Sequence, residues 1–157
     1  MKNEMAKQHN YMITLRHFNK NDIPELKNNM FVGKTDEEII SVLSEWDNLE
    51  FKGKYSEFFA VICNERIVGY VSLYQHNDYI ISVGPEIFLE YRRKGYAYEA
   101  LKQAYDYAKG KGYKVATAQV RNNNIASIKL HEKLGFVLDC EMINRHGNEV
   151  YIYIKLL

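Results

Sequence analysis

A strand–helix–strand unit between residues 79 and 120 most constrains what this chain can fold into. Small and apolar residues recur there at helical spacing, at Ala97, Ala100, Leu101, Ala104, Tyr105 and Ala108, and Gly110 and Gly112 end the pattern. Runs rich in β-branched and aromatic residues flank this helix at residues 79–89 and 115–120. Strands joined by a helical crossover are parallel neighbours in one sheet. The unit therefore predicts a mixed sheet with helices on both faces.

The remaining periodicity predicts the other elements. Strands are predicted at residues 11–18, 58–63, 67–74, 136–144 and 149–156, and helices at residues 23–30, after Thr35, and from Asn124 to Leu134. Thr35 and Glu38 have the spacing of a capping box. The three strands between residues 58 and 89 form an antiparallel meander, and the last two strands form a hairpin. The predicted order is β-α-α-β-β-β-α-β-α-β-β, an α/β (α+β) fold.

The length and charge bound the class of protein. A chain of 157 residues has the usual size of one domain, predicted here at residues 11–157 behind a polar tail at residues 1–10. A net charge of +1 favours neither nucleic acid nor a membrane surface as the main partner. No apolar run has the length of a signal peptide core or of a membrane span. We therefore expect a cytoplasmic protein.

The two cysteines, Cys63 and Cys140, lie in separate apolar, strand-like runs. The sequence has no CxxC pair and no Cys/His cluster with metal-ligand spacing. We therefore expect two buried free thiols and predict no metal site.

The start of the strongest helix has the features of an anion site. Three cations, Arg92, Arg93 and Lys94, precede Gly95 and Ala97, whose small size lets a ligand approach the backbone. The N–H groups of a first helical turn point outward with the positive end of the helix dipole. This pattern suits a phosphate or a pyrophosphate. The alternative interpretation is a solvated basic run followed by an ordinary turn glycine.

The chain resembles the GNAT superfamily of acyl-CoA N-acyltransferases. Arg92, Gly95 and Ala97 match the family signature of Arg or Gln, two residues, Gly, one residue, then Gly or Ala. The runs at residues 124–127 and 131–136 are similar to a later motif of the family, and the resemblance covers residues 11–157. Within the family, the chain looks closest to the branch of ribosomal-protein N-terminal acetyltransferases. The resemblance implies a sheet of about seven strands with about four helices, in which the fourth and fifth strands splay apart.

The resemblance also implies a cosubstrate, acetyl-CoA, and the residues that bind it. Its pyrophosphate would lie on the backbone at Arg92, Arg93, Lys94, Gly95, Tyr96, Ala97 and Tyr98, and its pantetheine arm would pair with the strand end at Ile87, Phe88 and Leu89. Leu89 stands where the family often has proline. Asn124 and Ser127 would face the pantetheine arm, although Asn124 is equally interpreted as a helix cap.

The catalytic residues are less well marked. Glu86 is the acidic residue of the fourth predicted strand, and burial beside the cleft would suit it to act as a base; the alternative is a solvent-facing carboxylate. His131 stands where many relatives have a tyrosine general acid, and an exposed helix histidine is an equal alternative. Gln119 stands where some relatives have a glutamate base. These two departures leave the acid–base roles open.

The expected function is direct transfer of an acetyl group from acetyl-CoA to a primary amine, either a protein N-terminus or a small molecule. The acceptor side is predicted to include Glu45, Trp46, Tyr55, His76, Tyr151 and Tyr153, but nothing in the sequence selects the amine. A catalytically weak acyl-CoA-binding module and an unrelated anion-binding domain are the alternatives. A homodimer is left open.

Overall fold

The computed structural model describes residues 12–157, so the predicted tail at residues 1–10 and Tyr11 lie outside the described part. The strands are β1 (Ile13–Arg16), β2 (Glu50–Phe51), β3 (Lys54–Cys63), β4 (Arg66–Gln75), β5 (Ile80–Ile87), β6 (Val115–Arg121), β7 (Val137–Ile143) and β8 (Glu149–Leu156). The α-helices are α1 (Ile23–Asn29), α2 (Asp36–Trp46), α3 (Tyr96–Gly110) and α4 (Ile125–Lys133). Two 3₁₀ turns, η1 (Lys20–Asp22) and η2 (Leu89–Tyr91), complete the order.

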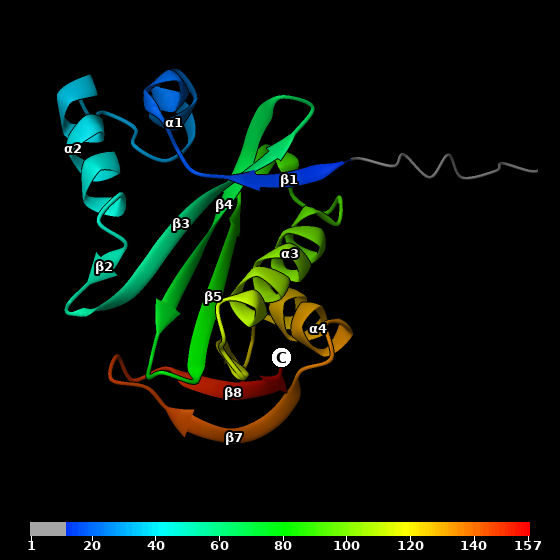
Figure 1. The fold of residues 1–157 in the computed structure, drawn as a ribbon. Helices are drawn as coiled ribbons and strands as arrows, with labels where there is room; N and C mark the ends of the chain where they lie inside the picture. Colours follow the sequence, from blue (N-terminus) through cyan, green and yellow to red (C-terminus); the bar gives the residue numbers. More distant parts are fainter. Residues whose placement is uncertain (1–11) are drawn as a thin grey trace, which may run out of the picture.

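The strands form one mixed sheet in the order β1-β3-β4-β5-β6-β8-β7, with the short β2 paired to β3 (Figure 1). Strands β3, β4 and β5 make the predicted antiparallel meander, and β7 and β8 make the predicted hairpin. The pair β5–β6 is parallel, as the crossover through α3 requires. The fold class predicted from the sequence is confirmed, whereas the short β2 and the two 3₁₀ turns were not predicted.

Strands β5 and β6 separate soon after they pair. Their register joins only Ile80 to Val115, Ile81 to Ala116 and Ser82 to Thr117, although both strands continue beyond these pairs. Pro85 follows in β5, and a proline offers no N–H for a ladder. The splay that the family resemblance implied between the fourth and fifth predicted strands, here β5 and β6, is therefore present.

Helices cover both faces of the sheet, with α3 and α4 on one face and α1 and α2 over the other (Figure 1). Successive side chains of β3 point to opposite faces of the sheet, so they belong to two separate core clusters. Phe59 and Val61 pack in the cluster that includes α3, whereas Ala60 and Ile62 belong to a second cluster on the opposite face. The α3 stripe predicted from the sequence is buried, and the predicted capping box of Thr35 and Glu38 starts α2.

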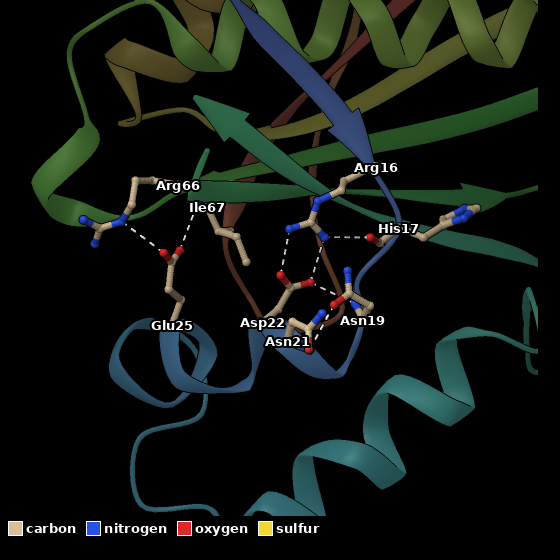
Figure 2. Close-up of polar contacts among 8 residues, drawn as sticks. All are labelled: Arg16, His17, Asn19, Asn21, Asp22, Glu25, Arg66 and Ile67. Atoms are coloured by element: carbon tan, nitrogen blue, oxygen red, sulfur yellow. Dashed lines mark hydrogen bonds and ion pairs between the residues drawn. The ribbon is translucent and has the colours of Figure 1, made fainter. Parts of the chain in front are cut away.

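Carboxylates fix α1 and the turn before it to the sheet (Figure 2). The guanidinium group of Arg16, at the end of β1, donates two hydrogen bonds of 2.8 and 2.7 Å to the buried carboxylate of Asp22. Glu25 in α1 accepts a hydrogen bond of 3.0 Å from Arg66 and one of 2.8 Å from the backbone N–H of Ile67. These contacts hold the first helix and the turn before it against β1 and β4.

The two cysteines differ in burial. Cys63 is a buried free thiol as expected, but Cys140 is exposed because every residue of the edge strand β7 is exposed. The expectation of two buried thiols is therefore wrong for Cys140.

No helix within residues 12–157 is long and apolar enough to cross a membrane.

A buried carboxylate joins β3 to the end of α3. Glu57 is 1% exposed and accepts hydrogen bonds from the hydroxyl groups of Tyr55 and Tyr107, and it pairs with Nε2 of His17 at 2.6 Å. Burial alone would raise the pKa of Glu57, but these hydrogen bonds outweigh it and lower the pKa below its ordinary value of 4.5. The stabilisation from the ionised Glu57 is therefore present above pH 4.5 and is lost as the pH falls through the lowered pKa.

We predict that Glu57→Gln lowers the free energy of unfolding at neutral pH by about 2 kcal/mol, because hydrogen bonds to a charged group are lost. The variant also shows a shallower fall of that free energy below pH 4.5 than the wild type does. Urea denaturation across a pH series measures both effects. Glu65→Gln, in the exposed β3–β4 turn, is the control; equal pH slopes for Glu57→Gln and the wild type would contradict the assignment.

Candidate functional site

The start of α3 is open and positively polarised. Gly95 is the N-cap residue with a left-handed φ of 82°, and Arg93 is also left-handed with a φ of 65°. A Cβ atom added at Gly95 meets no atom within 4 Å, so space remains in front of the helix. The amides of Ala97 and Tyr98 belong to the first turn and point along the positive end of a 15-residue helix. The predicted anion site has the required backbone geometry.

A cleft of about 560 Å³, called here the α3 cleft, lies in front of this helix start. Its walls come from β5, the segment before α3, the first turn of α3, and α4. The lining residues are Pro85, Glu86, Ile87, Tyr91, Arg92, Arg93, Gly95, Tyr96, Ala97, Tyr98, Asn124, Ala126, Ser127, Leu130 and Lys133. Residues far apart in the sequence are therefore brought together as predicted.

The predicted cations behave differently from one another. Arg92 donates 2.8 Å to the carbonyl oxygen of Ile87 and pairs with Glu86 at 2.7 Å, so it braces the loop against β5. Arg93 lines the cleft, whereas Lys94 lies over the ring of Tyr91 and is not among the lining residues. Sequence reasoning missed Lys133, a lining residue from the last turn of α4, because nothing local to its charge indicates the cleft.

The strand end predicted to pair with a pantetheine arm is only partly available. Ile87 lines the cleft, but Phe88 is buried and its N–H donates 2.9 Å to the carbonyl oxygen of Val68. Leu89 is 80% exposed and starts η2. Backbone groups alternate along a strand, so those of Pro85 and Ile87 point toward β6 when those of Phe88 point toward β4. The carbonyl of Ile87 already accepts from Arg92 and Pro85 has no N–H, so this edge offers the N–H of Ile87 and the carbonyl of Pro85. Of the three predicted residues, only Ile87 therefore faces the splay.

A second cavity of about 470 Å³ passes through the splay between β5 and β6 and is called here the aperture. Pro85 and Ser127 line both the aperture and the α3 cleft, so the two cavities adjoin. Ser127, in α4, lies on the face covered by α3 and α4, whereas Tyr74 and Gln119 come from the opposite face. The aperture therefore connects the two faces of the sheet.

The predicted face of α4 lines this route. Asn124 accepts 3.1 Å from the N–H of Ser127, so it caps α4, and it also lines the α3 cleft. Ser127 lies at the junction of the two cavities, and His131 lines the aperture. Both interpretations of Asn124, as a cap and as a cleft residue, are thus compatible with its position.

His131 is buried, with 3% exposure, so the alternative of an exposed histidine is wrong. Its Nδ1 lies 2.8 Å from the carbonyl oxygen of Ser127, and a carbonyl only accepts, so Nδ1 bears a hydrogen. Burial lowers the pKa of His131 below its ordinary value of 6.5, partly offset by that hydrogen bond. Nε2 has no hydrogen-bond partner among residues 12–157. At neutral pH the ring thus presents a lone pair at Nε2, and its catalytic role stays a prediction.

Glu86 does not have the buried surroundings on which its predicted role depended. Its side chain is 46% exposed and pairs with Arg92 at 2.7 Å. The position agrees better with the solvent-facing alternative, although its role in catalysis stays a prediction.

The predicted acceptor residues separate into three groups, one of which is Tyr151 alone, in a pocket between β7 and β8. His76 lines the aperture, and Glu45 and Trp46 line a neighbouring pocket on the same face of the sheet. Tyr55 contacts Glu57 on the α3 face, and Tyr153 is buried in the core beside α3. The position of the last two agrees with a structural role.

We predict that the His131 ring is less than half protonated at pH 6.5, because burial lowers its pKa, and that the neutral ring bears its hydrogen on Nδ1. Nitrogen NMR of the histidine rings distinguishes the two tautomers and the charged form, and the signal absent from His131→Gln assigns the resonance. A ring that is half protonated at or above pH 6.5, or that bears hydrogen on Nε2, would refute this picture.

Comparison with known proteins adds independent findings. A family model described as "Acetyltransferase (GNAT) family" matches residues 20–136. No curated protein sequence matches the chain. Among solved structures, the ribosomal-protein alpha-N-acetyltransferase RimL in complex with coenzyme A is similar, with 15% identity, a TM-score of 0.77, and coverage of 92% of this chain and 94% of that one.

Two further solved structures share the fold. A chimera of the spermidine N-acetyltransferase SpeG from Vibrio cholerae and hSSAT has 20% identity, a TM-score of 0.73, and coverage of 92% and 95%. The acetyltransferase YncA from Salmonella typhimurium, described as putative and solved with acetyl-CoA, has 20% identity, a TM-score of 0.67, and coverage of 92% and 93%. At these identities the similarity establishes the fold alone.

Proposed function

Because the chain belongs to the acetyltransferase (GNAT) family, we propose that it transfers an acetyl group from acetyl-CoA to a primary amine by direct attack in a ternary complex. The observation that carries this proposal is the aperture, which joins an anion-binding helix start on one face of the sheet to the opposite face. Acetyl-CoA is the cosubstrate of this family, and the amine approaches from the side of α1 and α2.

The residues present fit acetyl-CoA. The amides of Ala97 and Tyr98, with Arg93 and Lys133, supply donors and positive charge for the pyrophosphate. The N–H of Ile87 and the carbonyl of Pro85, which face the splay, supply hydrogen-bond groups for the amides of the pantetheine arm, whereas the carbonyl of Ile87 is taken by Arg92. The thioester would then lie in the aperture beside His131.

The chemistry needs a nitrogen–carbon bond to form, a carbon–sulfur bond to break, and one proton to move from nitrogen to sulfur. The neutral His131 accepts that proton at Nε2 from the attacking amine, and the imidazolium then gives it to the departing thiolate. The carbonyl of Ser127 favours the imidazolium, because it accepts the hydrogen bond from Nδ1. Proximity of the amine to the thioester supplies the rest of the acceleration.

We predict that Gly95→Glu weakens CoA binding at least about tenfold, because a carboxylate enters the space for the pyrophosphate and a charge-assisted contact is lost. Calorimetric titration with CoA measures the change. Gly33→Glu is the matched control, since Gly33 has nearly the same φ, 83°, and lies away from the α3 cleft. Equal affinities for the two folded variants would refute the site.

We predict that His131→Gln lowers kcat by about 100-fold or more while the dissociation constant of CoA changes little, which is the usual effect of losing a general acid–base group. Discontinuous assays that follow release of the CoA thiol with a panel of amines measure kcat. Wild-type turnover in His131→Gln would leave proximity as the main mechanism.

The same panel tests the alternative of a catalytically weak acyl-CoA-binding module. If CoA binds but every small amine and peptide N-terminus stays unacetylated, the binding module is the better description. If millimolar CoA does not raise the thermal stability of the chain, both descriptions fail, because a ligand of the folded state must stabilise it.

A further inference from the structure

A pocket of about 280 Å³ adjoins the aperture on the face opposite α3 and is called here the α2 pocket. It lies between the end of α2 and strands β2, β3 and β4. Tyr74 lines both the α2 pocket and the aperture. A molecule that reacts in the aperture can therefore extend into the α2 pocket.

The α2 pocket has a strongly negative rim. Glu45 and Glu50 line it, and no hydrogen bond or ion pair joins either side chain to another group within residues 12–157. Glu45 and Trp46 occupy the last turn of α2, whose carbonyl groups form the negative end of the helix dipole. That last turn contains no basic residue. The local field therefore attracts a cation.

Aromatic rings form the rest of the wall. Trp46 stacks on Phe58 with ring centroids 4.3 Å apart, and Phe58 meets Tyr74 edge-on at 5.9 Å. Phe51 continues the group, with its centroid 6.2 Å from that of Tyr74. The ammonium of Lys52 already lies 5.2 Å from the centroid of Phe51. Such rings attract ammonium groups through their quadrupoles and also pack against methylene chains.

A buried hydroxyl lies at the base of the pocket without a partner. Ser56 is 4% exposed and lines the α2 pocket, and its Oγ makes no hydrogen bond to the described part of the chain, residues 12–157. It is paired in register with Tyr74, the residue shared with the aperture. An unsatisfied buried hydroxyl is costly, and an N–H donor from a ligand removes that cost.

We infer that the acceptor is a small linear amine with at least two ammonium groups, a diamine or a longer polyamine. One amino group reacts in the aperture, and a second, still charged, lies in the α2 pocket between Glu45 and Glu50. The rings pack on the methylene chain between them, and Ser56 accepts a hydrogen bond from the distal ammonium. This inference rests on the proposed function for the reacting amine, but the α2 pocket can be tested without catalysis.

The kinetic test compares α,ω-diamines of increasing chain length with n-alkyl monoamines of the same length. We expect kcat/KM for the best diamine to exceed that of its monoamine at least tenfold, and the ratio to fall as ionic strength rises. The double variant Glu45→Gln, Glu50→Gln reduces this ratio toward one and leaves kcat/KM for monoamines unchanged. Glu37→Gln, on the first turn of the same helix, is the matched control and keeps the ratio.

The binding test uses Trp46, the single tryptophan of the chain. We expect diamines to change its fluorescence saturably in the absence of acetyl-CoA, whereas monoamines do not, and Ser56→Ala to weaken that response. A fluorescence response without any acetyl transfer would support the α2 pocket and count against the proposed function.

Acetylation of monoamines or peptide N-termini at least as efficient as that of diamines, together with an unresponsive Trp46, would overturn the inference and leave the proposed function intact. A double variant that lowers kcat/KM for monoamines and diamines equally would also overturn it, since the carboxylates would then have only a general effect.

Discussion

The site depends on the short parallel pairing between β5 and β6. The two strands stay in register for three residue pairs and then diverge at the approach to Pro85, which offers no N–H to extend the ladder. The divergence opens a route through a sheet that would otherwise separate the two faces. It also leaves backbone groups of β5 facing the route, which the proposed function pairs with the amide groups of the pantetheine arm. The helices determine the charge at each end of this route.

The two ends of the route have opposite electrostatic character. On one face, the positive end of α3 with Arg93 and Lys133 suits the phosphates of CoA. On the other face, the negative end of α2 with Glu45 and Glu50 suits a cation. Between them, burial keeps His131 neutral, and its hydrogen bond to the Ser127 carbonyl leaves Nε2 as an acceptor. In the proposed mechanism, an anionic donor and a cationic acceptor approach the same neutral base from opposite sides.

Much of the fold was predictable because its signals are local. The α3 stripe, the capping box at Thr35 and the crossover are each encoded by neighbouring residues, and the CoA signature at Arg92, Gly95 and Ala97 is equally short. The surroundings of single side chains were not predictable. The pairing of Glu86 with Arg92, the burial of His131 and the place of Lys133 in the cleft depend on packing between distant segments. The domain division at residues 1–10 and 11–157, the cytoplasmic location and a homodimer stay predictions.

A crystal structure of the chain with CoA tests the central claim most directly. The account predicts the pyrophosphate on the first turn of α3 beside Gly95, the pantetheine arm along β5 near Ile87, and the thiol sulfur in the aperture within hydrogen-bond reach of Nε2 of His131. A CoA molecule bound elsewhere, or one whose thiol stays outside the aperture while its phosphates occupy the α3 cleft, would contradict the proposed route for transfer.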